Sequence, residues 1–309
     1  MAVGHAMMCM SGDSIREPRD GSTMNESVSS AMPERMPALY GSATGRRITM
    51  RDLAQATSEG RKWPMITTYD AMSARIFDEA GIPALLVGDS AAMVVYGYDS
   101  TLPVSVDDLL PLVKAVVRGS TRSMVIADLP FGSYQASASQ ALETAAAFMK
   151  DGGAHAVKLE GGQAMLPQIE TLANAGVPVI GHLGLTPQSV NLLGGYRVQG
   201  RGESGEILMR DAKAMEACGA SALVLEAVPA DLAARVTEIL SIPTIGIGAG
   251  PDTDAQVIVW QDLLGMSAGP LPRFVKKYAD LHSIMSEGVQ EWAADVVSGA
   301  YPAPEHAYA

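Results

Sequence analysis

The sequence predicts an α/β protein built as a (β/α)8 barrel, and the order of its apolar segments is the main evidence. Eight short apolar runs follow one another between residues 65 and 259, with helix-like stretches between most of them. Several runs are uniformly apolar, which is typical of parallel strands that are covered on both faces. This alternation favours a closed barrel, and a doubly wound open sheet is the alternative. The predicted strands are Met65–Thr68, Ala84–Val87, Met124–Ala127, Ala156–Glu160, Pro178–Gly181, Ala222–Leu225, Thr244–Ile247 and Gln256–Val259.

Helical periodicity connects these strands. It predicts helices over Ala71–Ala80, Gln140–Asp151 and Glu206–Cys218. Three connections reach a glycine just before the next strand, which indicates a glycine helix cap used three times. The segment from Gly248 to Ala255 is too short for a full helix, so the seventh unit is predicted to be degenerate. A last helical region is predicted over Arg273–Ser298, packed outside the barrel or against another subunit.

The overall composition excludes several classes of protein. Hydrophobic residues make up 48% of the chain and charged residues 18%, which suits a large core and argues against extensive disorder. The formal net charge is −12 and no stripe of Lys and Arg occurs, which argues against nucleic acid or anionic membranes as partners. No apolar run approaches the ~18 residues of a membrane span. Cys9 and Cys218 suggest neither a disulfide framework nor a zinc site, which fits a reducing cytoplasm.

The domain organisation follows from a change in composition and hydrophobic periodicity near residue 45. Residues 1–44 are rich in Ser, Met, Gly, Pro and charge without hydrophobic periodicity, and they are predicted to be a disordered leader. Met24, Met32 or Met36 could equally be the start of translation. Residues 45–309 are predicted to form one barrel domain with its C-terminal helical region.

Ionisable side chains close six successive predicted strands. In a (β/α)8 barrel, the carboxyl ends of the strands meet at one face, and active sites gather there. A single such residue is most often a helix cap or a solvated carboxylate, and a lone Lys-x-Glu pair is most often a salt bridge. Six of them in succession predict one shared polar site. The residues are Asp70, Asp89, Asp128, Lys158 with Glu160, His182 and Glu226.

The balance of charge at these strand ends suggests a metal. Asp89, Asp128 and Glu160 come from neighbouring strands, and three unpaired carboxylates would raise one another's pKa. Oxygen ligands without cysteine favour Mg²⁺ over zinc. Lys158 would neutralise a substrate carboxylate or act as a Schiff-base nucleophile. A Mg²⁺ ion that polarises a carbonyl makes the adjacent C–H acidic, and Glu226 is placed to be the base.

Two glycine-rich segments and one histidine are also predicted to lie at the face where the strand ends meet. His182 is expected to be a hydrogen-bond donor or to support the metal ligands. The loop Gly194–Gly200 is long enough to act as a lid. The segment Gly246–Gly250 lacks the glycine spacing of a dinucleotide-binding motif. It instead favours a tight turn that lets the backbone approach a ligand.

Longer motifs resemble the ketopantoate hydroxymethyltransferase family. The resemblance extends over about Ile48–His306, departing from the usual Leu-Gly-Met at Ala91-Ala92-Met93. The motifs, in chain order, are Val87–Ser90, Gly97–Pro103, Ala127–Phe131, Lys158–Gly162, Gly181–Gln188, Gly194–Gly200, Leu225-Glu226 with Val228-Pro229, Gly246–Gly250 and Ser298–Pro302.

This resemblance implies a barrel of the phosphoenolpyruvate/pyruvate superfamily that assembles as a homodecamer. It implies hydroxymethyl transfer from 5,10-methylenetetrahydrofolate to 3-methyl-2-oxobutanoate, which gives 2-dehydropantoate for pantothenate and coenzyme A. It also implies that Asp89, Asp128 and Glu160 hold Mg²⁺, and that Glu226 is the proton acceptor. The keto acid would be bound by Asp89, Ser90, Asp128 and Lys158.

Two other functions stay open at this point. One is a Mg²⁺-dependent lyase or aldolase on the same barrel that cleaves a 2-oxo acid without folate. The other is a catalytically silent barrel, whose signature would be the loss of the acids at the strand ends. All of these acids are present.

Overall fold

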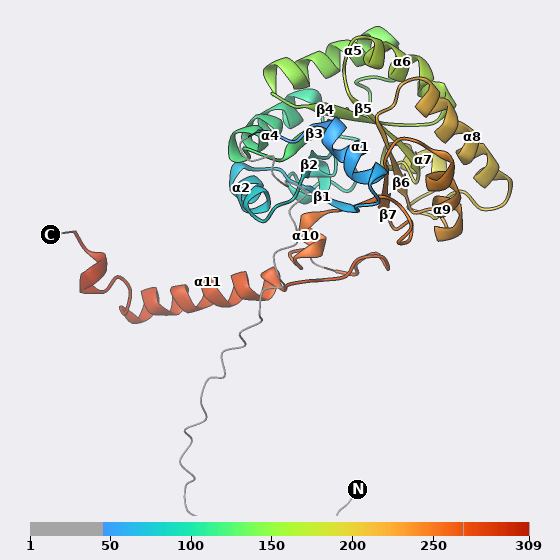
Figure 1. The fold of residues 1–309 in the computed structure, drawn as a ribbon. Helices are drawn as coiled ribbons and strands as arrows, with labels where there is room; N and C mark the ends of the chain where they lie inside the picture. Colours follow the sequence, from blue (N-terminus) through green and yellow to red (C-terminus); the bar gives the residue numbers. More distant parts are fainter. Residues whose placement is uncertain (1–45, 268, 309) are drawn as a thin grey trace, which may run out of the picture. The chain divides into compact units, whose positions relative to one another are not determined.

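The computed structural model describes residues 46–267 and 269–308, and the predicted leader and Cys9 lie outside them (Figure 1). Eight parallel strands close a barrel in chain order, because β1 pairs with β8 as well as with β2. The predicted barrel is therefore confirmed, and the open sheet is wrong. The strands are β1 Trp63–Thr67, β2 Ala84–Val87, β3 Met124–Asp128, β4 Ala156–Glu160, β5 Val179–Gly184, β6 Ala222–Glu226, β7 Thr244–Ile247 and β8 Ala255–Ile258.

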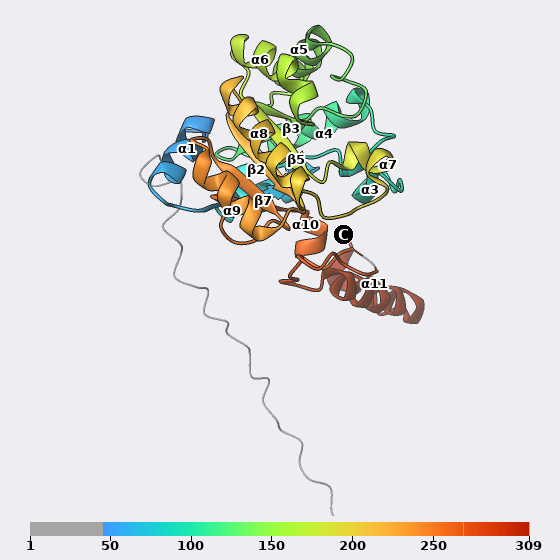
Figure 2. The ribbon, with the colours of Figure 1, turned by 90° about the vertical axis from the view of Figure 1, so that its right-hand side faces the viewer.

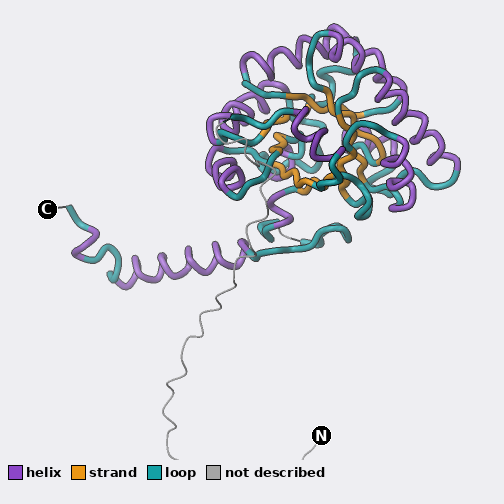
Figure 3. Tube along the Cα trace, viewed as in Figure 1, coloured by secondary structure: helices purple, strands orange, loops and turns teal. Residues whose placement is uncertain are grey.

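Helices surround these strands, as the purple and orange tubes of Figure 3 show. Between β7 and β8 the described chain has no helix, which confirms the degenerate seventh unit. No helix of the described residues is long and apolar enough to cross a membrane. The α-helices are α1 Met50–Ser58, α2 Ala71–Glu79, α3 Ala91–Val94, α4 Val106–Gly119, α5 Ala138–Ala146, α6 Leu166–Asn174, α7 Val190–Leu193, α8 Glu203–Ala217, α9 Ala230–Ile239, α10 Trp260–Leu263 and α11 Leu281–Ser298.

The predicted cap before the strands is present at all three places. Gly81, Gly176 and Gly219 have φ values of 88°, 82° and 97°, in the left-handed region that glycine adopts without a steric penalty. Each lies between a helix and the strand that follows it. The chain reverses direction there in a few residues, which brings β2, β5 and β6 back into the barrel parallel to their neighbours.

Strand residues alternate between two apolar cores. Leu86 and Ile126 belong to a cluster inside the barrel, which Leu53 of α1 joins at one end. Leu85 and Val157 belong to the larger cluster between the strands and the helices. This alternation follows from the period of two in a strand, and it decides which residues of each strand face the barrel interior.

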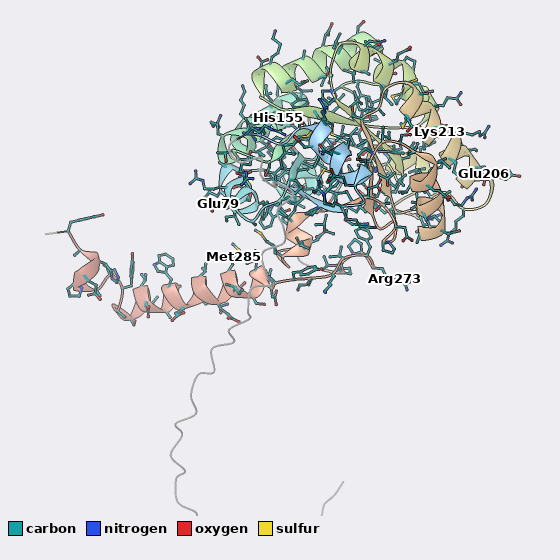
Figure 4. All side chains as sticks on the ribbon, in the orientation of Figure 1. Glu79, His155, Glu206, Lys213, Arg273 and Met285 are labelled. Atoms are coloured by element: carbon teal, nitrogen blue, oxygen red, sulfur yellow. The ribbon has the colours of Figure 1, made fainter. Side chains whose placement is uncertain are left out.

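The C-terminal helix begins later than its sequence predicts. Residues 273–280 are not helical. The N–H of Tyr278 instead donates to the carbonyl of Leu263 at the end of α10, and the N–H of Leu281 donates to the carbonyl of Leu264 just after it. From Leu281 the chain is one continuous helix (Figure 2). None of its residues is buried, and Met285, labelled in Figure 4, is one of its exposed apolar side chains.

Candidate active site

The carboxyl ends of β2 to β6 bring most of the predicted side chains into one cavity of about 440 Å³. Glu226 keeps 17% of its side chain exposed, whereas the other charged strand-end residues of this cavity are buried. Apolar side chains form much of the remaining wall, including Leu86, Val224 and Val257. The predicted residues that line this cavity are Asp89, Ser90, Asp128, Lys158, Glu160, His182 and Glu226.

Strand alternation explains why these side chains point inward. Ala156 lies in the interior cluster, so Lys158 and Glu160, two and four residues later, face the same side. By the same count, Asp128 follows Ile126 of β3 in the interior cluster. The parallel register then places Asp128 beside Lys158, and Glu160 beside the histidine of β5.

Lys158 makes its close ion pair with the neighbouring strand. Its Nζ lies 2.8 Å from Oδ1 of Asp128 and 3.9 Å from Oε1 of Glu160. Burial lowers the pKa of Lys158, but the carboxylates of Asp128, Glu160 and Asp89 outweigh it and raise the pKa above its ordinary value. A protonated, ion-paired ammonium suits charge neutralisation, whereas a Schiff base needs the neutral amine.

His182 connects the charged cluster to Glu226. Its Nδ1 lies 3.3 Å from Oε1 of Glu160, and its Nε2 lies 3.3 Å from Oε2 of Glu226. Burial and the Lys158 charge lower the pKa of His182, but the nearby carboxylates of Glu160 and Glu226 outweigh them and raise it to about 9. The imidazole therefore lies between the Glu160 and Glu226 carboxylates.

The negative charges of the carboxylates at the ends of β2 and β3 are not fully balanced by nearby donors and cations. Burial raises the pKa of Asp89 well above its ordinary value, and the charges of Asp128 and Glu160 raise it further. Burial also raises the pKa of Asp128, although Lys158 opposes this. Glu160 differs, because His182, Lys158 and a backbone N–H outweigh its burial and lower its pKa. The cluster thus holds more negative charge than its own cations balance.

The chemistry of these side chains suits a hard divalent cation. Three oxygen-bearing side chains meet where negative charge is in excess, and carboxylate oxygens are the ligands that Mg²⁺ prefers. In the part of the chain that the structure describes, no three His, Cys, Asp or Glu side chains are already grouped as a metal-ligand set. The Lys158 ammonium lies between Asp128 and Glu160, so bound ligands would have to complete such a site.

Asp70 is the one strand-end acid outside the cavity. Its Oδ1 accepts hydrogen bonds from the N–H groups of Met72 and Ser73, at 2.8 and 2.9 Å. It is the N-cap of α2. Of the two readings that the sequence allows, the helix cap is the correct one.

The two glycine-rich segments both lie at the cavity. Tyr196 and Arg197 of the predicted lid line it. In the segment Gly246–Gly250, Gly248 and Gly250 have φ values of 62° and 81°, and a Cβ on Gly248 would lie 2.7 Å from the ring of Phe274. The backbone here approaches a side chain of the same protein. No helix follows β7, so the turn lacks the helix N-terminus of a dinucleotide site.

The structure also places residues at the site that the sequence did not single out. Tyr69 is buried, and its hydroxyl lies 2.8 Å from Oγ of Ser90. Gln188 and Tyr134 contact the buried carboxylate strands. Gln188 is the last residue of the family-like motif Gly181–Gln188, and this position was the signal in the sequence that could have pointed to it. Nothing in the local sequence distinguishes Tyr134 from other tyrosines.

The family model for ketopantoate hydroxymethyltransferase matches residues 47–304. The chain belongs to the ketopantoate hydroxymethyltransferase family. The 3-methyl-2-oxobutanoate hydroxymethyltransferase of Frankia alni is 61% identical over 272 residues, which cover 88% of this chain and 90% of that protein. The protein of the same name from Thermobifida fusca is 60% identical over 274 residues, covering 88% and 98%.

Solved structures of other barrels share the fold of this chain. Phosphonopyruvate hydrolase, solved with oxalate and Mg²⁺, aligns with a TM-score of 0.55 at 14% identity, covering 84% of this chain and 93% of that one. The 2,3-dimethylmalate lyase of the PEP mutase/isocitrate lyase superfamily aligns with a TM-score of 0.53 at 16% identity, with the same coverage. At these identities the likeness establishes the barrel fold alone.

Proposed function

We propose that this chain transfers a hydroxymethyl group from 5,10-methylenetetrahydrofolate to 3-methyl-2-oxobutanoate, giving 2-dehydropantoate for pantothenate and coenzyme A biosynthesis. One observation carries the proposal beyond family membership. A partly exposed carboxylate, Glu226, faces the same cavity as a buried cluster of three carboxylates and one ammonium. This pairing of a base with a charged binding site suits proton removal next to a carbonyl.

The buried cluster binds the keto acid. Asp89, Asp128 and Glu160 would hold a Mg²⁺ ion, which would supply Lewis-acid polarisation of the substrate carbonyl. Lys158, ion-paired with Asp128, offsets the negative charge that the substrate carboxylate adds. Ser90, held by the Tyr69 hydroxyl, offers a hydrogen bond to the substrate.

Glu226 is the base. Its carboxylate accepts the C3 proton, and the resulting enolate forms a carbon–carbon bond to the one-carbon unit of the folate. The two carbon–nitrogen bonds of that unit break, one water supplies the hydroxyl oxygen, and tetrahydrofolate leaves. His182 orients Glu226 through the 3.3 Å contact of its Nε2. The apolar wall of Leu86, Val224 and Val257 receives the branched methyl groups of the keto acid. The lid residue Tyr196 lies at the same cavity and closes it over the substrates.

An assay that omits one component at a time tests this proposal. The full mixture contains 3-methyl-2-oxobutanoate, methylenetetrahydrofolate and Mg²⁺, and the expected result is that 2-dehydropantoate forms only when all three are present. Consumption of the oxo acid without folate would contradict the proposal and favour a lyase. The homodecamer, the cytoplasmic location and the domain boundary at residue 44 stay predictions.

A further inference from the structure

Gln188 lies at the centre of a buried hydrogen-bond network beside the carboxylates. It sits in the 3-10 turn Pro187–Ser189 after β5, and it is 5% exposed. Its Nε2 donates to Oδ2 of Asp89 at 2.9 Å and to the carbonyl oxygen of Leu129 at 3.0 Å. Its backbone N–H donates to Oε2 of Glu160 at 3.0 Å. One residue thus contacts strand ends of β2, β3 and β4.

The amide oxygen of Gln188 is held from the opposite side. It accepts a hydrogen bond from the Tyr134 hydroxyl at 2.7 Å and one from Nε2 of Gln135 at 3.1 Å. Tyr134 is buried, and its hydroxyl oxygen also accepts the backbone N–H of Glu160 at 3.1 Å. A reversed amide would direct its oxygen at the Asp89 carboxylate and the Leu129 carbonyl, so these partners fix its orientation.

An amide in this place orients a carboxylate without neutralising it. Lys158 adds positive charge beside Asp128, whereas Gln188 gives Asp89 a donor and no charge. Among the described residues, no hydrogen bond or ion pair reaches Oδ1 of Asp89. One oxygen of this carboxylate is therefore fixed by protein, and the other is left for a cation or a water bound to it.

We propose that Gln188, anchored by Tyr134, is a positioning residue that sets the orientation of the Asp89 and Glu160 carboxylates before cation and substrate bind. The proposal rests on the proposed Mg²⁺ function of these acids. Outer partners of metal ligands commonly change metal affinity about 10-fold to 100-fold when they are removed. The same effect is expected here, because without its amide the Asp89 side chain is free to rotate toward Lys158.

The test measures Mg²⁺ binding by calorimetry on the free protein, without substrate, and compares matched variants. Gln188→Met removes the amide at nearly constant volume, and Tyr134→Phe removes only the anchoring hydroxyl. Gln168→Met is the control: Gln168 is 4% exposed and donates to the backbone carbonyl of Tyr134 at 3.3 Å, but it contacts no carboxylate.

Gln188→Met is expected to raise the Mg²⁺ dissociation constant about 10-fold and Tyr134→Phe about 3-fold to 10-fold, with no change in Gln168→Met. Saturating Mg²⁺ should restore most of kcat in Tyr134→Phe, as a positioning role requires. Equal Mg²⁺ affinity in all variants, with only thermal stability lowered, would overturn the proposal. If Gln188→Met does not fold, the Mg²⁺ affinity of Tyr134→Phe alone tests the proposal. Absence of Mg²⁺ binding by the unmutated protein, both alone and with 3-methyl-2-oxobutanoate, would instead reject the proposed function, and this inference with it.

Discussion

Two buried aspartates, at opposite ends of the barrel, are treated differently by their surroundings. At the amino-terminal end, Asp78 accepts hydrogen bonds from the N–H and hydroxyl groups of Thr121 and Ser123, and from the N–H of Arg122. Burial alone would raise its pKa, but these bonds lower it. At the carboxyl end, Asp89 accepts one side-chain hydrogen bond, from Gln188, and its pKa is raised.

This difference distinguishes a charge that stabilises the fold from a charge that is available to bind a ligand. Asp78 has as many donors as a carboxylate can use, so it fastens the turn before β3 and has no capacity left for a ligand. Asp89 lies beside two other acids with too few donors, so a ligand must supply the compensation. The comparison predicts that substitutions at the two ends will differ in kind, as follows from the largest effect to the smallest.

Glu226→Gln should have the largest effect, and only on catalysis. The amide cannot accept the C3 proton, so the rate should fall about 10³-fold. Stability should change little, because the side chain is partly exposed and loses one contact, with His182. Exchange of the C3 hydrogen of 3-methyl-2-oxobutanoate in deuterated water, followed by NMR, measures the step directly. The exposed Glu238→Gln is the control, and full exchange in Glu226→Gln would remove Glu226 from the role of base.

Asp78→Ala should lower stability by about 3 kcal/mol, since it leaves buried N–H groups of the 121–123 turn without acceptors. Urea unfolding measures this loss. The matched control is Asp252→Ala, at an exposed position near the same end of the barrel, for which a change within about 0.5 kcal/mol is expected. Equal effects of the two substitutions would show that Asp78 does not fasten the turn.

Asp89→Asn should act in the opposite direction. A carboxyl group whose pKa is raised on folding costs stability at pH 7, so removing its charge should stabilise the metal-free protein by about 1 kcal/mol. Thermal unfolding in the presence of EDTA tests the sign. A loss of stability like that of Asp78→Ala would contradict the contrast between the two ends.

His155 gives a smaller, pH-dependent effect at the amino-terminal end. Burial and the Arg47 charge lower its pKa from 6.5 to about 4, and its Nδ1 accepts the N–H of Val125. The unfolded chain binds this proton first, so stability should fall as pH drops from about 6.5 to 4, by about 1–2 kcal/mol. Unfolding of His155→Gln at pH 7 and 4.5 should show a weaker loss than the exposed control His282→Gln. Identical pH profiles would exclude His155 as the cause.

Much of the fold and site could be predicted because barrel geometry turns order along the chain into proximity. Asp128, Lys158, Glu160, His182 and Glu226 end consecutive parallel strands, and the strand ends meet at one face. The start of α11 could not be predicted, because residues 273–280 have helical spacing but bond to the end of α10 instead.

Hydrogen bonds between distant segments also escaped prediction. Gln188 bonds to Asp89 across 99 positions of sequence and to Tyr134 across 54. An uncharged amide in a loop motif carries no signal of such partners, whereas a charge at the end of an apolar strand does. The sequence therefore indicated the charged groups of the site but not the neutral groups that hold them.

A calorimetric titration with Mg²⁺ tests most directly whether the under-compensated acids at the mouth form a cation site. The unmutated protein should bind about one Mg²⁺ per chain, and the double variant Asp89→Asn, Asp128→Asn should lose measurable binding. Asp78→Asn, at the opposite end, should bind as the unmutated protein does. Binding that survives in the double variant, or that is lost in Asp78→Asn, would contradict this account of the two ends.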